Sequence, residues 1–580
     1  MKGAKEARGA VSAPSRRVER RVGVAATIPD VFSDVDLAVQ HLSLPGAGAR
    51  PGHESGTAGG VTSGASGRLA AIDVGSNSVH MIVVEPEANG AYRVLSRERE
   101  MVRLGRSAFA AGGRLSDEAM GDGLEALVKM TTLAALRGAD RIVAVATSAV
   151  REAGNGGEFL ALLRAQTGVV LQLLSGEDEG ALIFRAVREV IDLGAGPAVI
   201  VDVGGGSTEW ITAEGGELDG VVSLRLGSLR CAGSLAGDPP NARSRERLRR
   251  AIRSQLARLV PARKGARLVA TSGTAVCCAD LIDLEAGGAR PDRNVKGGGL
   301  REVRLRDLSA LVERLSRLKR IDIAALPPVG PPRAESLLAG AILLEELARH
   351  AGVDRFLVSD RALREGLVLA ALKHPIPRGA EPTDLRRRQV LRLAERTETV
   401  HGHSLQTARL AVRLFDLTVS VHGLGRRERE WLEYAALLHD IGYSIHYRKH
   451  HEHSCYLILH AALDAFEPSE IEVVAQVARF HRGRAPRPSH PALAPLKPWQ
   501  QKAIRKLAAL LRIADALDRT HASRVEELYC SIRAKRVKLE VISRFAVDLE
   551  LESVREHGRL FEKVFERKLA ARQGLETAEA

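Results

Sequence analysis

The chain has 580 residues, 45% of them hydrophobic and 27% charged, a composition typical of a soluble globular protein and long enough for three or four domains. No apolar run approaches the roughly 18 residues that span a bilayer, and the N-terminus lacks the apolar segment of a secretory signal. The five cysteines form no CxxC pair, so we expect reduced thiols. These features exclude an integral membrane protein and favour a cytoplasmic one.

The net charge of +14 suits a polyanionic partner such as nucleic acid, anionic lipid or a phosphate chain. A basic surface that only keeps the protein soluble explains the same charge equally well. Charge alone therefore does not choose the partner.

Residues 1–66 are rich in Gly, Ala, Ser and Arg without periodicity, which predicts a disordered extension. From Arg68 onward, short apolar runs that resemble buried strands alternate with helical segments. The strand-like runs are RLAAID, HMIVVE, RIVAVAT, VVLQLL, PAVIVDV and ARLVAT, and the helical segments are SDEAMGDGLEALVKMTTLAAL and GGEFLALLRAQT. This alternation predicts α/β sheets covered by helices on both faces.

A Pro-rich stretch at 374–384 predicts a linker, beyond which the chain becomes strongly helical. Thirteen of the eighteen histidines follow residue 400, and short alternating runs return after Arg524. We therefore expect a disordered extension, two α/β domains, a mostly α-helical domain and a small α+β C-terminal region. Their bounds are 1–66, 67–195, 196–375, 376–523 and 524–580.

Two segments repeat at an offset of 129 residues: IDVGSNSVHMIVVE (72–85) and VDVGGGSTEWITAE (201–214). Each has a strand that ends in Asp, a glycine-bearing hairpin with hydroxyl residues, and a second strand. Similar turn chemistry makes a chance match possible, but an Asp at the strand end has no role in a tight turn. Because glycine lets backbone N–H groups approach an anion, we expect two phosphate loops that face each other across a cleft.

The acidic residues of the second copy, Asp202 and Glu209, would repel a bare phosphate. They are explained by a hard cation such as Mg²⁺. Common nucleotide-binding motifs do not fit, because GxxxxGK[ST] is missing and Glu209 stands at the position of a third Rossmann glycine.

Six motifs occur in the order IDVGSNSVHM, TSAVREAGN, SGEDEGALIF, DVGGGSTE, TSGT and SDRALREG. Together, over about Arg68 to Lys373, they resemble the exopolyphosphatase/guanosine pentaphosphate phosphohydrolase (Ppx/GppA) family. The resemblance implies two actin-like domains, of the RNase H-like, sugar kinase and heat-shock ATPase superfold. It also implies a homodimer that hydrolyses terminal phosphoanhydride bonds of inorganic polyphosphate or converts pppGpp to ppGpp.

The same resemblance assigns roles to residues. Glu179 is implied as the catalytic base that activates water, although a carboxylate at a helix N-terminus is also favourable for the helix dipole. Asp202 and Glu209 are implied as the Mg²⁺ ligands, and Arg151 as a phosphate contact or, alternatively, a helix-start salt bridge. The residues implied around the phosphates are Asp73, Gly75, Ser76, Asn77, Ser78, Gly204, Gly205, Gly206 and Ser207.

The helical segment carries a second pattern: His403, His439 with Asp440, and Asp515. Histidine and carboxylate ligands on successive helices suit a divalent metal, and the order resembles the HD phosphohydrolase superfamily. The resemblance implies Mn²⁺, Fe²⁺ or Mg²⁺ at these four residues, with His453 and His481 at a second metal or a phosphate. A relic that only binds chain is the alternative. Basic residues of this region could line a polyphosphate track or merely face solvent: Arg505, Lys506, Arg512, Arg519 and Arg524.

The leading hypothesis is a Mg²⁺-dependent exopolyphosphatase without a specific nucleic-acid or membrane partner. Three alternatives stay open. The first is an ATP-dependent kinase of the same superfold, the second a metal-dependent nucleotide or (p)ppGpp phosphohydrolase acting through the HD-type domain, and the third a non-catalytic sensor of polyphosphate or alarmone.

Overall fold

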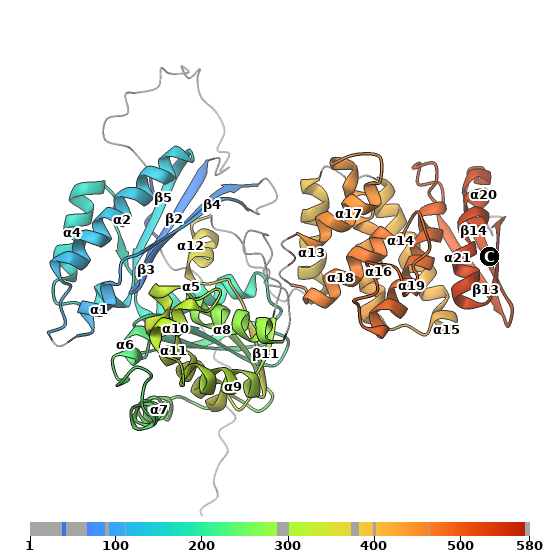
Figure 1. The fold of residues 1–580 in the computed structure, drawn as a ribbon. Coiled ribbons are helices and arrows are strands. Elements are labelled where there is room, and N and C mark those ends of the chain that lie inside the picture. Colours follow the sequence, from blue (N-terminus) through green and yellow to red (C-terminus); the bar gives the residue numbers. More distant parts are fainter. Residues whose placement is uncertain are drawn as a thin grey trace, which may run out of the picture.

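The computed structural model describes residues 37–41, 67–87, 92–110, 112–286, 301–372, 382–397, 402–461, 463 and 465–574. These residues form two α/β units and, beside them, a helical unit that ends in a three-stranded sheet (Figure 1). The two α/β units together are called the body below. No helix within the described ranges combines the length and the hydropathy needed to cross a membrane.

The two sheets of the body share one strand order. In the first sheet β2, β3 and β4 form an antiparallel meander and β5 runs parallel to β2, while β7, β8, β9 and β10 repeat this arrangement in the second. The strands of the first sheet are β1 (Gln40–His41), β2 (Arg68–Val74), β3 (Ser78–Pro86), β4 (Tyr92–Met101), β5 (Ala139–Ala146) and β6 (Gln172–Leu173). Those of the second are β7 (Pro197–Val203), β8 (Thr208–Glu214), β9 (Glu217–Leu224), β10 (Arg267–Thr271), β11 (Arg301–Arg304) and β12 (Arg355–Val358). The repeat seen in the sequence is thus a repeat of the fold.

Helices cover the outer face of each sheet. On the first sheet lie α2 (Asp117–Leu136), whose N-terminal Ser116 accepts a hydrogen bond from the N–H of Ala119, and α4 (Gly156–Thr167). Both helices were expected from their periodicity. The second sheet is covered by α7 (Ala242–Leu256), α8 (Ser272–Glu285), α9 (Leu305–Leu315) and α11 (Pro331–His350).

The inner faces of the two sheets share one core. It consists of α5 (Gly176–Arg188) and α12 (Leu363–Ala371) packed against residues of both sheets, including Ile82 and Ile211. Thus α5, which follows the first sheet in sequence, contacts β8 and β9 of the second, and α12 contacts β2 and β3 of the first. Short helices complete the body: α1 (Leu104–Ala108), α3 (Ser148–Glu152), α6 (Ser228–Ala232) and α10 (Arg320–Ala325).

The helical unit and the C-terminal sheet have a single core of their own. The helices are α13 (Pro382–Arg396), α14 (Gly402–Leu417), α15 (Val419–His422), α16 (Arg426–Leu438), η1 (Ile441–Ser444), α17 (His450–Leu459), α18 (Pro468–Arg479) and α19 (Pro498–Ala516). The C-terminal part has β13 (Glu527–Arg533), β14 (Arg536–Ile542), α20 (Asp548–His557), α21 (Arg559–Phe565) and β15 (Lys568–Gly574). The expected α+β region is therefore present but packs as part of the helical unit.

Two expectations need correction. Residues 37–41, inside the extension expected to be disordered, include β1, which pairs antiparallel with β5, and the rest of 1–66 lies outside the described residues. The expected linker is too long, because α13 already begins at Pro382, and residues 373–381 lie outside the described ranges. A short strand at a sheet edge and a Pro in the first turn of a helix both leave weak sequence signals.

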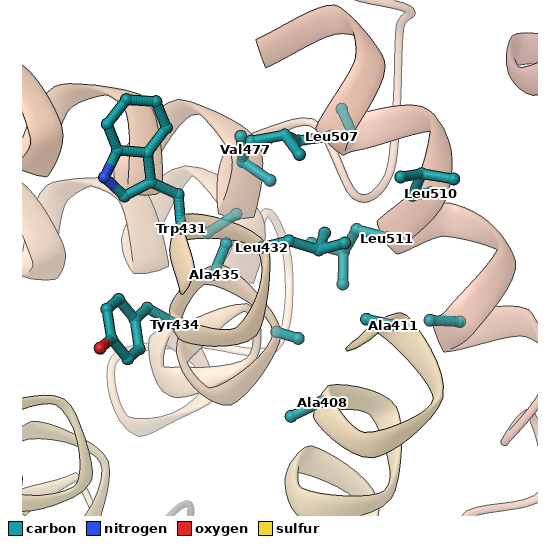
Figure 2. Close-up of a cluster of buried hydrophobic side chains, with 14 of the residues drawn as sticks. Ala408, Ala411, Trp431, Leu432, Tyr434, Ala435, Val477, Leu507, Leu510 and Leu511 are labelled. Carbon is teal, nitrogen blue, oxygen red and sulfur yellow. The ribbon is translucent and has the colours of Figure 1, made fainter. Parts of the chain in front are cut away.

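The core of the helical unit yields a stability prediction. Leu432 is fully buried on α16 and lies among Leu507, Leu511 and Val477 (Figure 2). We expect Leu432→Ala to lower the free energy of unfolding of this unit by about 2–5 kcal/mol, because it leaves a cavity in a packed core. Urea unfolding followed by tryptophan fluorescence measures the change, and Leu405→Ala, at a side chain that is 44% exposed, is the control. An equal loss in both variants would contradict the packing described.

Candidate active site and a histidine–aspartate cluster

The two glycine-bearing turns of the repeat have the same geometry. The N–H of Gly75 donates to the carbonyl of Ser78 at 3.1 Å, and that of Gly204 donates to the carbonyl of Ser207 at 3.0 Å. A short helix binds one carbonyl of each turn. In the first turn, the N–H of Gly105 in α1 donates to the carbonyl of Ser76 at 2.7 Å. Correspondingly, Leu229 in α6 donates to Gly205 at 3.0 Å.

The two turns lie against each other. A Cβ placed on Gly205 would make a tight contact of 3.1 Å with Cβ of Ser76, and one on Gly206 would lie 2.1 Å from Cζ of Phe109 and would have to displace that ring. The backbone N–H groups of Ser76, Asn77, Gly205 and Gly206 have no acceptor among the described residues. Such groups form a site for phosphate oxygens.

Glu179 lies where the two units meet. Its helix, α5, begins after Ser175, whose hydroxyl accepts a hydrogen bond from the N–H of Asp178 at 3.0 Å. Glu179 follows in the first turn, is 8% exposed, and has an oxygen 3.5 Å from Nη1 of Arg151. Because α5 packs between the sheets, this carboxylate lines the same cavity as both turns.

Four acidic residues converge beside the turns. Burial, reinforced by their mutual repulsion, raises the pKa of Asp73 to about 7 and that of Glu209 to about 8. Burial likewise raises the pKa of Asp202 to about 6, and it raises that of Glu179 well above its usual value. Arg151 and Arg364 offset only part of this repulsion, so the gathered carboxylates would be stabilised by a bound cation.

The oxygen atoms of this group fit a hard cation. Oδ1 of Asp73, Oδ1 of Asp202 and Oε2 of Glu179 are buried and have no hydrogen-bond donor among the described residues. Carboxylate oxygens are the ligands that Mg²⁺ takes in proteins. Glu209 lies behind this set, 1% exposed, and accepts a hydrogen bond from Oγ of Ser223 at 2.8 Å. The residues therefore could hold Mg²⁺, with Asp202 nearer the cavity than Glu209.

The cavity has a volume of ≈ 1590 Å³. It is lined by most of the residues expected at the phosphates: Asp73, Gly75, Ser76, Asn77, Ser78, Gly204, Gly205 and Ser207. Gly206 and Arg151 are not part of this lining. Arg151 instead donates to the carbonyl of Leu174 at 2.6 Å and lies 3.5 Å from Glu179, so its placement favours the salt-bridge interpretation.

Three groups of cavity residues had no assigned role in the sequence. His80 lies opposite Asp73 in the pair of β2 and β3, just as Glu209 lies opposite Asp202 in the pair of β7 and β8. His80 and Glu209 are therefore equivalent positions of the repeat. Thr271 ends β10 beside Asp202, which brings the TSGT motif to the cavity. Arg361 and Arg364 of SDRALREG line it from the start of α12. The repeat register could have identified His80.

A second group of titratable side chains lies in the helical unit. His403 on α14, His439 at the end of α16, Asp440 and Asp515 on α19 come together, as the HD-type pattern implies. Nε2 of His403 lies 3.3 Å from Oδ1 of Asp515 and 3.8 Å from Oδ2 of Asp440. Nε2 of His439 lies 3.4 Å from the same Asp440 oxygen and 3.7 Å from Asp515.

The other oxygen of Asp440 faces a further pair. Nε2 of His450 lies 3.3 Å away, Nε2 of His481 lies 3.7 Å away, and the two nitrogens are 3.3 Å apart. The expected partner His453 is half-buried and is not part of the group, so His450 replaces it. The reason is the helix start: Lys449 has a left-handed φ of 64°, and α17 begins directly after it with His450.

The rings are oriented for metal binding. Nδ1 of His439 donates to the carbonyl of Ala436 at 2.7 Å, and Nδ1 of His481 donates to that of Ala478 at 2.7 Å. Nδ1 of His450 lies 3.2 Å from the carbonyl of Tyr447. Because Nδ1 faces a backbone carbonyl in each case, Nε2 is the nitrogen that faces the carboxylates and would bind a metal.

Charge within this cluster is partly compensated. Burial alone would raise the pKa of Asp515, but hydrogen bonds from His403 and His439 outweigh it and hold that pKa well below its usual range. Burial, together with the neighbouring His439, lowers the pKa of His481 to about 3, which keeps this ring neutral. His403, His439 and Asp440 form one possible ligand group, with Asp515 close to both of these histidines, and His450 and His481 form another with Asp440. Both groups suit divalent cations.

Two of the basic residues that could have lined a polyphosphate track, Lys506 and Arg512, bind backbone carbonyls instead. Arg512 is 9% exposed and donates to the carbonyls of Phe480 and Gly483, and Nζ of Lys506 donates to the carbonyl of His422. Both side chains brace the fold. Arg524 donates to the carbonyl of Ala546, and Arg519 is exposed.

In a comparison with known protein families, the body and the helical unit match two different profiles. Residues 82–374 match the profile of the Ppx/GppA phosphatase family, and residues 385–555 match that of Ppx/GppA phosphatase, domain III. Exopolyphosphatase 1 of Mycobacterium leprae is 34% identical over 312 residues, which cover 53% of this chain and 89% of that protein. Exopolyphosphatase 1 of Mycobacterium tuberculosis (strain ATCC 25618 / H37Rv) is 33% identical, with coverages of 53% and 88%.

Solved structures were compared as well. A crystal structure of an exopolyphosphatase from Cytophaga hutchinsonii superposes with a TM-score of 0.49 at 22% identity and covers 53% of this chain and 98% of that one. That of the Aquifex aeolicus Ppx/GppA family member gives 0.46 at 25% identity, covering 53% and 99%.

The cleft carboxylates predict how stability depends on pH without metal. Their folded pKa values of about 6 to 8 lie above the unfolded values near 4, so the stabilisation is complete below pH ~4 and is lost as pH rises through 6–8. In EDTA we expect the urea midpoint of the body to fall from pH 5 to pH 8.5 and added Mg²⁺ to restore it. Asp202→Asn should flatten this fall, whereas the exposed Glu177→Gln should not. The same slope in Asp202→Asn and wild type would contradict the prediction.

Proposed function

We propose that this chain, which belongs to the Ppx/GppA phosphatase family, is an exopolyphosphatase that removes the terminal phosphate of inorganic polyphosphate and also converts pppGpp to ppGpp. The observation that carries the proposal is Glu179, a buried carboxylate whose Oε2 accepts no hydrogen bond, in one cavity with two turns of free backbone N–H groups. We also propose that the two α/β units, with their common strand order, are of the actin-like superfold, and that the protein is a cytoplasmic homodimer.

In the proposed reaction the terminal phosphate lies between the turn at Ser76 and the turn at Gly205. Their N–H groups bind its oxygens, and the glycine backbone allows this close approach. Mg²⁺ held by Asp202 and Glu209, with Asp73 nearby, would neutralise negative charge on the phosphates. Glu179 accepts the proton of the attacking water, and Arg151 keeps its carboxylate in place from 3.5 Å.

The size of the cavity favours a chain as substrate. At ≈ 1590 Å³ it extends from the two turns to the helical unit, where Arg392 and Arg396 of α13 line it. Further arginines line the same cavity: Arg97, Arg99, Arg361 and Arg364. A terminal phosphate alone needs none of this length, whereas a polyphosphate chain can contact arginines along it.

The histidine–aspartate cluster supports a second candidate function. Two ligand groups that share Asp440 are the arrangement of a two-metal site, which suits hydrolysis of phosphate esters or anhydrides. We propose that the HD-type helical unit holds Mn²⁺, Fe²⁺ or Mg²⁺ at His403, His439, Asp440 and Asp515, and a second ion at Asp440, His450 and His481. Nucleotides or (p)ppGpp would be its substrates, and a metal-bound sensor without catalysis is the other outcome.

The catalytic assignment is tested by Glu179→Gln. We expect loss of phosphate release from long polyphosphate by a factor of about 10²–10⁴, because amide nitrogen and oxygen cannot accept the water proton at neutral pH. Release is measured with Mg²⁺ on long polyphosphate, short polyphosphate and pppGpp. Glu177→Gln, exposed two residues earlier on α5, is the matched control. Full activity of Glu179→Gln on every substrate would refute the role of Glu179.

The second metal position is tested by two neighbouring histidines. We expect His450→Ala to lower the Mn²⁺ content of the purified protein from two ions to one per chain, and His453→Ala to leave it unchanged, because only His450 faces Asp440. Elemental analysis after dialysis measures the content. Equal metal content in His450→Ala and wild type would exclude this ligand set. Phosphate release from polyphosphate in both variants shows whether the cluster contributes to that reaction.

A further inference from the structure

His403 is held differently from the other three histidines of the cluster. Their Nδ1 atoms contact backbone carbonyls, whereas Nδ1 of His403 lies 2.8 Å from Oδ2 of Asp518, a side chain that is 1% exposed. His403 is thus the one histidine of this cluster whose second nitrogen meets a carboxylate.

Asp518 is itself fixed in place. It follows the end of α19 directly after Leu517, and its N–H donates to the carbonyl of Asp515, so ligand and carboxylate belong to one turn. Its second oxygen, Oδ1, accepts a hydrogen bond from the N–H of Ser523 at 2.8 Å. Both oxygens are therefore acceptors, and neither can turn away from its donor without losing a buried hydrogen bond.

This arrangement determines the state of the His403 ring. A carboxylate only accepts, so Nδ1 donates to Asp518, and Nε2 is the nitrogen that remains for a metal ion. Nε2 faces Asp515 at 3.3 Å and Asp440 at 3.8 Å. The ring of His521 stacks on His403 with centroids 3.7 Å apart and planes at 3°, which restricts tilting of the ligand ring.

We propose that Asp518 is the positioning residue of the first metal position and makes it the tighter of the two. The inference rests on the proposed metal cluster. That position has two carboxylate ligands, Asp440 and Asp515, and a third carboxylate directly behind a histidine ligand. The second position has only the shared Asp440, and its histidines are oriented by neutral carbonyls. A carboxylate behind a metal-binding histidine strengthens the ligand, and its loss typically costs 10–100-fold in affinity.

The alternative is that Asp518 only braces the loop at Ser523. Asp518→Asn separates the two roles, because an amide has one acceptor oxygen and one donor group. If the oxygen keeps the hydrogen bond from Ser523, the amide N–H₂ faces His403 and forces its proton onto Nε2, where the metal lone pair is needed. Thr520→Val is the matched control, since it removes the 2.5 Å bond from Thr520 to Glu550 in the same loop and leaves His403 untouched.

The experiment titrates the metal-free full chain with Mn²⁺ and follows free Mn²⁺ by electron paramagnetic resonance. Wild type should bind two ions, one more tightly. Asp518→Asn should weaken the tighter ion about 10–100-fold and leave the weaker one unchanged, with the metal-free thermal midpoint near that of wild type. Thr520→Val should bind as wild type.

Several results would overturn the inference. Wild-type affinities in Asp518→Asn, an equal loss at both positions, or the same loss in Thr520→Val would assign Asp518 a structural role only. Wild type that binds no Mn²⁺ would overturn the metal cluster itself, and the inference with it. Polyphosphate hydrolysis at the cleft is a separate readout, so its failure would refute the proposed exopolyphosphatase and not the role of Asp518.

Discussion

The packing of α5 between the two sheets is the constraint on which the rest of the body depends. Its buried residues, among them Ile183 and Val187, share one core with inner-face residues of both sheets and with α12. A helix on the outer face of either sheet would carry Glu179 away from one of the two turns. Because α5 lies between them, its first turn reaches the junction of the two halves, and one carboxylate can serve phosphate loops that come from different sheets.

The two candidate sites solve the problem of buried charge in opposite ways. In the cleft, four carboxylates share the cavity region with Arg151, and their pKa values are raised. In the helical unit each carboxylate contacts histidines, and the pKa of Asp515 is lowered. The carboxylates of the cleft therefore need a cation to balance their charge. Those of the helical unit are already partly balanced by histidines.

The sequence alone predicted the features that depend on local pattern. Buried strands such as β2 and β7 appear as apolar runs, and the repeat in the sequence marks both turns. It did not reveal β4, an edge strand rich in Arg and Glu, because a strand with solvent on one side need not be apolar. It named His453 in place of His450, since the start of α17 depends on a left-handed Lys449 that no pattern marks. The role of Asp518 could not be predicted either, because its partner His403 lies 115 residues away in the sequence.

The separation of cores has a consequence for how this protein can change in evolution. The helical unit and its C-terminal sheet share one core, while α5 and α12 are exchanged between the halves of the body. A gene that lost everything after α12 would keep three complete cores. A gene split after α5 would yield two fragments, each with an uncovered sheet. The helical unit is thus a module with a core of its own, whereas each half of the body needs a helix from the other half to cover its sheet.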